Sequence, residues 1–300
     1  MHSRKMLCIA VLAAMLPFSY LHAQVSTATI LGTVTDRSGA VVPNARVTVT
    51  NLETNFSRSV ETDEVGQYSI PFLPTGTYRV EVVTSTFKKF VQTGVVLDVG
   101  RSARVDPVLD IGALTEVVSV TADAPLVNTT SAVVGRTVEN TEIVNLPLVN
   151  RNVYSLLNLT PGVEASVSGN AFGFREQRTM VNGGSYGGTG TVNYFLDGGN
   201  NTTGLRGTGN AVPNPDAVQE FRVITNSYGA EFGRFAGGVI DVVTKSGTNE
   251  FHGSLFEFIR NDKLNATTWN ASSKAPLRRN QFGGTLGGPV LRNRTFFFGS

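Results

Sequence analysis

The stretch most informative about the fold is residues 229–258, GAEFGRFAGGVIDVVTKSGTNEFHGSLFEF. Two predicted strands lie in it, separated by a Thr-Lys-Ser-Gly break. In residues 239–243 only Asp241 interrupts the β-branched run, as is typical of a strand buried on both faces. In residues 253–258 one side of the pleat carries Ser254, Phe256 and Phe258, and the other carries Gly253, Leu255 and Glu257. This second pattern suits a wall between lipid and a watery lumen, so a packed inner strand is expected to lead into a membrane β-strand.

The N-terminus has the features of a secretory signal peptide. Arg4 and Lys5 precede an apolar run over residues 6–16, and Leu21-His22-Ala23 before Gln24 has the form of a cleavage site. Residues 1–23 are therefore predicted to be a removable leader, with a buried N-terminal helix as the alternative. Cys8 lies in the leader, so the predicted mature chain has no cysteine for a disulfide or a thiolate site.

The predicted mature chain has no excess of basic residues that would indicate nucleic acid or anionic lipid as a partner. The chain has 25 Lys and Arg and 23 Asp and Glu, and two of the basic residues lie in the leader, which leaves 23 of each sign. No positive excess remains to indicate nucleic acid as a partner. After the leader no run approaches the ~18–20 apolar residues of a membrane helix. Membrane residence would therefore require a barrel.

Residues 24–111 are predicted to form a small β-sandwich of about seven strands. Alternating runs such as 45–50, 68–72, 78–82 and 95–99 are separated by turn signals at 36–39, 63–66 and 74–76. This density of short strands is typical of sandwiches. The patterns GTVTDRSGAVVPNARVTV (32–49) and TDEVGQYSIPFLPTGTYRVEV (62–82) resemble the carboxypeptidase regulatory-like domain, which has a prealbumin-like, carbohydrate-binding-like fold.

No residue pattern indicates catalysis. His252 is the one histidine after the leader, whereas a catalytic zinc site takes about three protein ligands. A serine or cysteine triad also needs a base, and His252 has no nucleophile motif near it. The glycine clusters at 183–190 and 204–209 do not spell a phosphate-binding loop. We therefore predict no enzyme activity, no catalytic residue, no metal and no cofactor.

Residues 112–125 are predicted to be a linker with a partner-binding segment. EVVSVTA resembles the TonB box of energised outer-membrane receptors, an extended stretch that adds as a strand to a periplasmic partner. The resemblance implies TonB contact by Glu116, Val117, Val118, Ser119, Val120, Thr121 and Ala122. The alternatives are a last sandwich strand or a plain linker.

Residues 126–247 resemble the plug domain of TonB-dependent receptors. Three pieces carry the resemblance: VENTEIVNLPLVNRNVYSLLNLTPGV (138–163), VNYFLDGGNN (192–201) and PNPDAVQEFRVITNSYGAEFGRFAGGVIDVVTKSG (213–247). A short helix capped by Thr141 and a second helix with Val153, Leu156 and Leu157 on one face are expected in the first piece. The resemblance implies structural roles in the plug for Pro147, Arg151, Pro161, Gly162, Asp197, Gly198, Gly237 and Gly238. The last two glycines are expected to allow close backbone approach inside the barrel.

Residues 248–300 resemble the start of the barrel in the large Oar-like TonB-dependent receptors. RNQFGGTLGGPVLRNRTFFFGS (279–300) has the pattern of a hairpin that turns over 291–295. Fifty residues at ~9–11 per spanning strand give about three strands, and the smallest membrane barrels have about eight. We therefore expect this chain to be the N-terminal part of a longer receptor.

The expected fold is mainly β: a small prealbumin-like β-sandwich, an α+β plug and the first strands of an incomplete outer-membrane barrel. The resemblance implies location in the outer membrane of a Gram-negative-type bacterium. The implied partners are the periplasmic TonB complex, outer-membrane lipid and a nutrient, whose class stays open with carbohydrate as one option. The alternative function is a surface carbohydrate-binding or adhesive module without transport.

Overall fold

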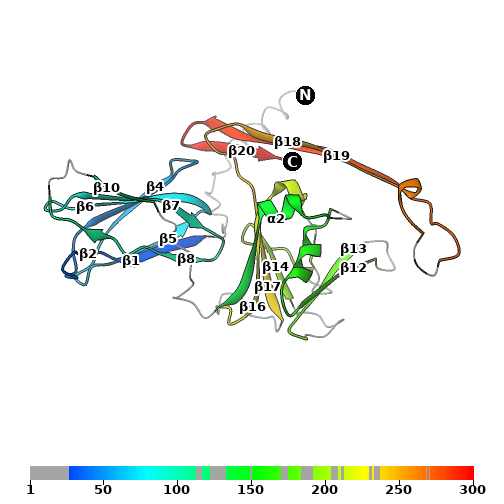
Figure 1. The fold of residues 1–300 in the computed structure, drawn as a ribbon, viewed down its shortest axis with the longest axis horizontal. Helices are drawn as coiled ribbons and strands as arrows, with labels where there is room; N and C mark the ends of the chain where they lie inside the picture. Colours follow the sequence, from blue (N-terminus) through cyan, green and yellow to red (C-terminus); the bar gives the residue numbers. More distant parts are fainter. Residues whose placement is uncertain are drawn as a thin grey trace, which may run out of the picture.

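The computed structural model describes residues 27–112, 117–121, 133–148, 151–169, 175–183, 192–203, 209–210, 213–229, 232, 237–267, 269 and 271–300. Figure 1 shows three parts in chain order: a β-sandwich, a sheet that carries short helices, and a long C-terminal sheet. The fold is mainly β, as predicted. In the described part of the chain, no helix is both long and apolar enough to cross a membrane.

Nine strands lie in the predicted sandwich region: β1 (Ala28–Thr33), β2 (Thr35–Asp36), β3 (Arg46–Asn51), β4 (Ser57–Glu61), β5 (Gln67–Leu73), β6 (Gly76–Val83), β7 (Lys89–Leu97), β8 (Ser102–Arg104) and β9 (Val108–Leu109). One layer has the order β5-β1-β8, and the other has the order β10-β7-β6-β3-β4, where β10 is Val117–Thr121. Most of the predicted inward-facing residues are buried: Ala45, Val47, Val49, Tyr68, Ile70, Tyr78, Val80, Val82, Val95, Leu97 and Val99. Period-two alternation therefore identified the sandwich core correctly.

Phe72 is an exception to this pattern. The alternation of Tyr68 and Ile70 predicts that Phe72 also faces inward, but its side chain is 68% exposed. Phe72 has φ 58°, and the pairing of β1 with β5 shifts register here, so that Leu73 lies opposite Ala28. The shift gives the buried position to Leu73 and turns Phe72 outward.

The second part, which we call the plug sheet, has the strand order β11-β16-β17-β14-β15. Its strands are β11 (Val134–Glu139), β14 (Val192–Leu196), β15 (Gly199–Asn200), β16 (Val218–Asn226) and β17 (Gly238–Thr244). The associated elements are α2 (Asn140–Asn145), the 3₁₀ helices η1 (Val153–Leu159) and η2 (Pro215–Ala217), and the hairpin β12 (Val163–Gly169) with β13 (Arg175–Val181). Residues 238–243 of β17 are all buried, which confirms the prediction of a strand covered on both faces.

The two short helices of this region differ in their agreement with prediction. Val153, Leu156 and Leu157 are buried on η1, as expected, although the helix is 3₁₀. The predicted cap at Thr141 is wrong, because α2 begins at Asn140 and Glu139 is its N-cap, without a side-chain cap bond. Strand β11 runs directly into the helix and leaves no separate capping turn. Asn140 instead donates from Nδ2 to the Val218 carbonyl, which ties the helix to β16.

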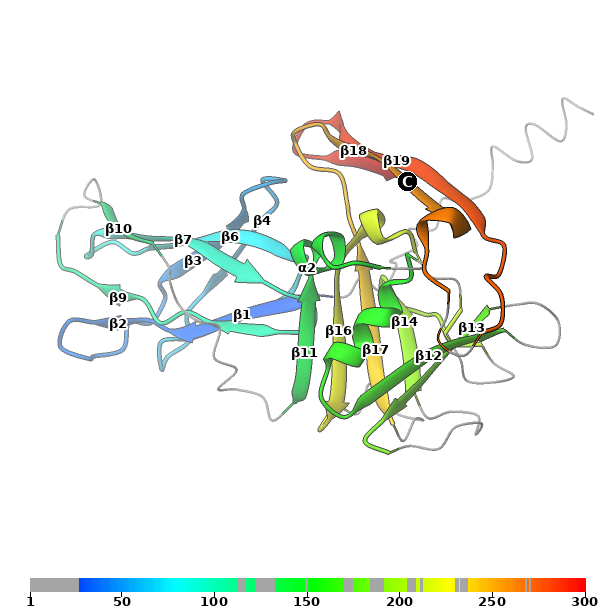
Figure 2. The same cartoon turned by 45° about the vertical axis from the view of Figure 1, so that its right-hand side comes forward.

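The C-terminal sheet contains β18 (His252–Asn261), the short helix η4 (Asp262–Leu264), β19 (Arg278–Leu291) and β20 (Thr295–Gly299), all antiparallel. It lies beyond the end of the plug sheet that carries α2 (Figures 1 and 2). The face of β18 that carries Phe256 and Phe258 does not point to the outer side as the wall pattern implied. Both rings lie against Arg151 of the plug region, while Leu255 and Ile259 on the other face are 93% and 60% exposed.

Gly247 lies where the chain leaves the plug sheet and crosses the C-terminal sheet. A β-carbon at this position would be 2.3 Å from the Phe297 carbonyl oxygen and 2.6 Å from that of Gly288. Both are backbone atoms of paired strands and cannot move independently of the sheet. Glycine is therefore required for this close crossing.

Candidate functional site

The candidate TonB segment, residues 116–122, is anchored on the sandwich over its described part. β10 runs parallel to β7, with Val117 opposite Lys89 and Thr121 opposite Thr93. The structure thus bears out the alternative in which the segment is the last strand of the sandwich, and leaves TonB contact as a proposal. Ser119 is exposed, and Glu116 and Ala122 lie outside the described residues.

The opposite end of β7 contacts the plug sheet. The backbone N–H of Val99 donates to Oε1 of Glu220 at 2.8 Å. Nη1 of Arg222 donates to the Val99 carbonyl at 3.1 Å and also to the Gly100 carbonyl. Gly100 has φ +61°, and a β-carbon there would approach Nη1 of Arg222 to 2.9 Å. We call this contact of the 99–100 turn with Glu220 and Arg222 the clamp.

The clamp buries charge. Glu220 and Arg222 are each 6% exposed. Burial raises the pKa of Glu220 to about 7, the Val99 hydrogen bond opposes this, and the nearby carboxylates of Asp98, Glu139 and Asp241 add to it. Burial also lowers the pKa of Arg222. The strength of the contact between the sandwich and the plug sheet therefore depends on whether Glu220 and Arg222 are charged.

Arg151 joins the plug region to the first strand of the C-terminal sheet. Its guanidinium carbon lies 4.1 Å from the centre of the Phe256 ring and 4.2 Å from that of Phe258. Nη2 donates to Oδ1 of Asn214 at 2.9 Å and forms an ion pair with Asp216. The Arg151 and Asp216 side chains are only 10% and 14% exposed. A largely buried ion pair that lies against two aromatic rings of one strand is a strong positional constraint on that strand.

The predicted Leu-Asp-Gly element forms the tight turn of the β14–β15 hairpin. Asp197 has φ 49° and Gly198 has φ 78°, and positive φ at both central residues is the geometry that Asp-Gly favours. The Asp197 carboxylate accepts from the backbone N–H and the hydroxyl of Thr244, at 2.8 and 2.9 Å. This turn therefore also fixes the end of β17, beyond which the chain leaves the plug sheet.

The other predicted plug residues have local roles and do not gather into one site. Pro147 is exposed just after α2, and Pro161 lies in the turn in which Gly162 has φ +77°. Gly237 is buried, and a β-carbon on Gly238 would lie 2.8 Å from the Ile224 carbonyl oxygen. At Gly238 the close approach is thus made within the plug sheet, to β16.

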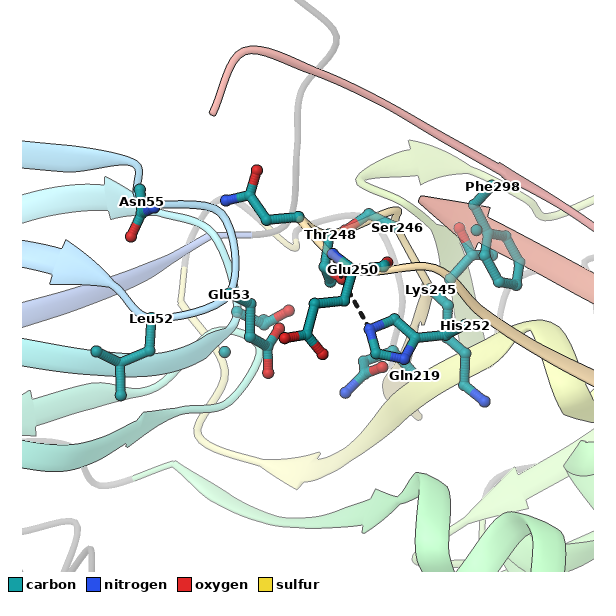
Figure 3. Close-up of a pocket in the computed structure, with 15 residues that line it drawn as sticks. Leu52, Glu53, Asn55, Gln219, Lys245, Ser246, Thr248, Glu250, His252 and Phe298 are labelled. Atoms are coloured by element: carbon teal, nitrogen blue, oxygen red, sulfur yellow. Dashed lines mark hydrogen bonds between the residues drawn. The ribbon is translucent and has the colours of Figure 1, made fainter. Parts of the chain in front are cut away.

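A pocket of about 550 Å³ with both polar and apolar side chains in its lining lies where the three parts meet (Figure 3). Glu53 enters it from the sandwich, Lys245 from the end of β17, and Glu250 and His252 from the start of β18. Nε2 of His252 and the Thr248 hydroxyl share a hydrogen bond of 2.9 Å. Burial lowers the pKa of Lys245, and Asp216 opposes the shift.

Beside this pocket three asparagines connect the sandwich to the C-terminal sheet. Oδ1 of Asn293, in the β19–β20 turn, accepts from Nδ2 of both Asn55 and Asn249 at 2.8 Å. The Asn293 N–H donates to Oδ1 of Asn249 at 2.8 Å, and the Asn249 N–H donates to the Glu53 carbonyl at 3.1 Å. The sandwich is therefore held by the β19–β20 turn as well as by the clamp.

The sequence did not predict the clamp, the contact of the three asparagines, or the close passage of Gly247 across the C-terminal sheet. Glu220 and Arg222 alternate with buried Phe221 and Val223, a pattern that favours a strand with one solvent-facing side. The structure covers that side with a turn more than a hundred residues earlier in the chain. The sequence gives no local signal for such a contact.

The comparisons with known proteins agree with this architecture. Residues 29–110 match the family described as carboxypeptidase regulatory-like domain, and residues 243–300 match the outer membrane beta barrel domain. The TonB-dependent transporter Oar of Myxococcus xanthus is 32% identical over 308 residues, which cover 97% of this chain and 28% of the relative. The chain thus spans less than a third of the length of that curated relative.

Similar solved structures include two receptors. The siderophore receptor PirA from Acinetobacter baumannii is 21% identical, with a TM-score of 0.39, over 53% of this chain and 22% of that chain. A mutant of the ferric enterobactin receptor PfeA from Pseudomonas aeruginosa is 20% identical, with a TM-score of 0.37, over 52% of this chain and 22% of that chain. The Oar match and the two family matches confirm the predicted resemblance and the predicted outer-membrane location.

Proposed function

The chain is homologous over nearly its whole length to a TonB-dependent transporter of the Oar type, and from that premise we propose that it supplies the sandwich, the plug and the first barrel strands of a receptor that imports a nutrient across the outer membrane. The observation that carries the proposal is the match over 97% of the chain. A contact inside the molecule supports it. Arg151 of the plug region is seated on the aromatic face of β18, as gating a barrel from inside requires.

The units have distinct roles in this proposal, with boundaries at 24–111, 112–125, 126–247 and 248–300 behind a leader of residues 1–23. The plug closes the barrel. Residues 116–122 offer an extended strand to TonB in the periplasm, through main-chain hydrogen bonds. Pro147, Arg151, Pro161, Gly162, Asp197, Gly198, Gly237 and Gly238 hold the plug in its closed form.

The proposed activity is transport and not catalysis, since the homology is to a transporter. A surface carbohydrate-binding or adhesive module is the competing function. Such a module has no use for a plug strand that continues through Gly247 into a membrane wall. Carbohydrate remains one option for the imported nutrient.

The test uses the full-length receptor in its host. A receptor-null strain is grown on a panel of iron chelates, oligosaccharides and peptides, each as the limiting nutrient. Transport predicts a growth defect on at least one nutrient. The wild-type gene should restore growth on that nutrient, and a protonophore should abolish its uptake. Val118→Pro removes a main-chain donor from the candidate TonB segment and should fail to restore growth, while cells still bind the nutrient. A strain that grows normally on every nutrient but loses adhesion would instead establish the surface-module function.

A further inference from the structure

β10 is an edge strand of the sandwich. It pairs along five residues with the outer end of β7, and the sheet ends with it among the described residues. One hydrogen-bonding edge of Val117–Thr121 is therefore occupied by β7, and the other faces away from the sheet. In Figures 1 and 2 this strand lies at the end of the sandwich far from the plug sheet.

The free edge lacks the features that usually protect sheet edges. Val-Val-Ser-Val-Thr contains no proline and no charge, and β-branched residues dominate it. The strand at the opposite end of the same sheet, β4, carries Arg58 and Glu61. Glu61 lies 3.5 Å from Arg46 in an ion pair on the exposed surface. Within one sheet, therefore, one edge is protected by charge and the other is open to a further strand.

An ordered edge is a better docking site than a free segment. A disordered segment loses backbone freedom when it binds, which lowers its affinity. In β10 that loss has already occurred through pairing with β7. A partner strand can then add while β10 stays paired with β7.

β7 also links this edge to the plug sheet. Its first half carries β10, and its last residue, Leu97, is followed within three residues by the turn that the clamp holds. The path from β10 to β16 is thus one strand and three hydrogen bonds to side chains of Glu220 and Arg222. A pulling force applied to β10 can therefore be transmitted to the plug sheet through β7 and the clamp.

We propose that the sandwich presents β10 as a preformed edge, on which a β-strand of a periplasmic partner adds while β10 stays paired with β7. The inference rests on the proposed function, in which that partner is TonB. It differs from a mechanism in which the segment is stored on the sandwich and must be released before it binds.

A disulfide between β7 and β10 separates the two mechanisms. Val91 and Ser119 are direct partners in the parallel pairing, which brings their α-carbons within the usual range for a disulfide. Residues 24–300 contain no cysteine, so Val91→Cys with Ser119→Cys introduces a defined pair in this region. The full-length receptor is purified in detergent, and its affinity for the purified C-terminal domain of the host's TonB is measured in the oxidised and reduced forms.

We expect the disulfide to form and the affinity to change less than threefold on oxidation. A larger loss on oxidation, or a pair that does not cross-link, would overturn the proposal. Thr48→Cys with Ser59→Cys, opposite each other on β3 and β4, is the matched control for cross-linking in the same sheet. Val118→Pro tests the function itself. If the TonB domain binds this variant as it binds wild type, or binds neither, the proposed TonB contact is wrong independently of where β10 lies.

Discussion

Individual charged residues hold the three parts of the chain together, and each does so from a largely buried position. Glu220 and Arg222 bind backbone groups of the sandwich, and Arg151 pairs with Asp216 beneath two phenylalanine rings. Burying a charge is unfavourable unless it is paired or hydrogen-bonded. Removing one partner of such a contact should therefore have a larger effect than removing an exposed ion pair.

The clamp should weaken as pH rises. The pKa of Glu220 is about 7 in the folded protein against 4.5 for the ordinary group, so the folded form binds the proton more tightly. The stabilisation is complete below pH 4.5 and is lost as pH rises through about 7, a change of about 3 kcal/mol at ~1.4 kcal/mol per pKa unit. Hydrogen exchange at the Val99 amide, corrected for the intrinsic rate, should lose protection over this range. Glu220→Gln should show flat protection, and a pH-dependent loss in that variant would contradict the assignment to Glu220.

Arg151→Met should destabilise the contact between the plug region and β18. The change leaves the Asp216 carboxylate buried without its ion-pair partner, which typically costs about 3–5 kcal/mol. Urea titration of the purified receptor, followed through hydrogen exchange in residues 133–159, measures the loss. Exposed Arg292→Met is the matched control and should stay within about 0.5 kcal/mol of wild type. Equal effects of the two substitutions would contradict the role of Arg151.

Among the elements, two strands have a face that another unit of the chain covers. β16 has a second side buried by the sandwich, and the aromatic face of β18 is turned towards Arg151. β10, β7 and the clamp form a continuous route across the sandwich. The sequence therefore predicted which residues form strands, but it did not predict which other unit covers each strand.

Gly247→Ala should disrupt the junction of the plug sheet with β19 and β20. The added methyl group would meet two backbone carbonyls at 2.3 and 2.6 Å, and the paired strands cannot yield without losing hydrogen bonds. We expect a destabilisation of about 1–3 kcal/mol, as for overpacking in a core. Limited proteolysis between residues 245 and 252 in the full-length receptor should accelerate. Gly299→Ala in β20, where a β-carbon has no neighbour within 4 Å, should leave the cleavage rate unchanged.

In the molecule as a whole, the described residues form two hydrophobic cores and one open sheet. This division predicts which parts fold independently and which part associates. The sandwich core draws its buried residues from 28–109 and the plug core from 138–242. The C-terminal sheet exposes a set of large apolar side chains: Phe251, Leu255, Phe258, Ile259, Phe282, Leu286, Val290, Leu291 and Phe297. The first two parts can fold around their own cores, and the third has an apolar surface to cover.

The sandwich should fold by itself. Residues 24–111 contain the complete sandwich core, and ~90 residues suffice for a small domain. The isolated piece should unfold cooperatively with heat and show β-type circular dichroism. Residues 24–121 should have a higher midpoint, because β10 adds five paired residues. A non-cooperative transition in both pieces would disprove the boundary.

The C-terminal sheet should cause association. Each apolar side chain covered on association contributes ~1.5–3 kcal/mol, and the outer edges of the sheet offer unpaired main-chain groups. Residues 24–300 should therefore aggregate or require detergent, whereas 24–247 should elute as a monomer in size-exclusion chromatography. A detergent-free monomer of 24–300 would show that these side chains pack within the chain.

The order of the parts, the sandwich core, the buried β17 strand and the Asp197-Gly198 turn could be predicted from the residue pattern alone, because they depend on periodicity and on local backbone preferences. The resemblance to outer-membrane receptors followed from the same local patterns. Three contacts became evident only in the folded chain: β10 lies on β7, Glu220 and Arg222 bind the 99–100 turn, and Phe256 and Phe258 face Arg151. These contacts join residues from about 25 to over 120 positions apart, and period-two alternation states which residues share a face without stating what will cover it.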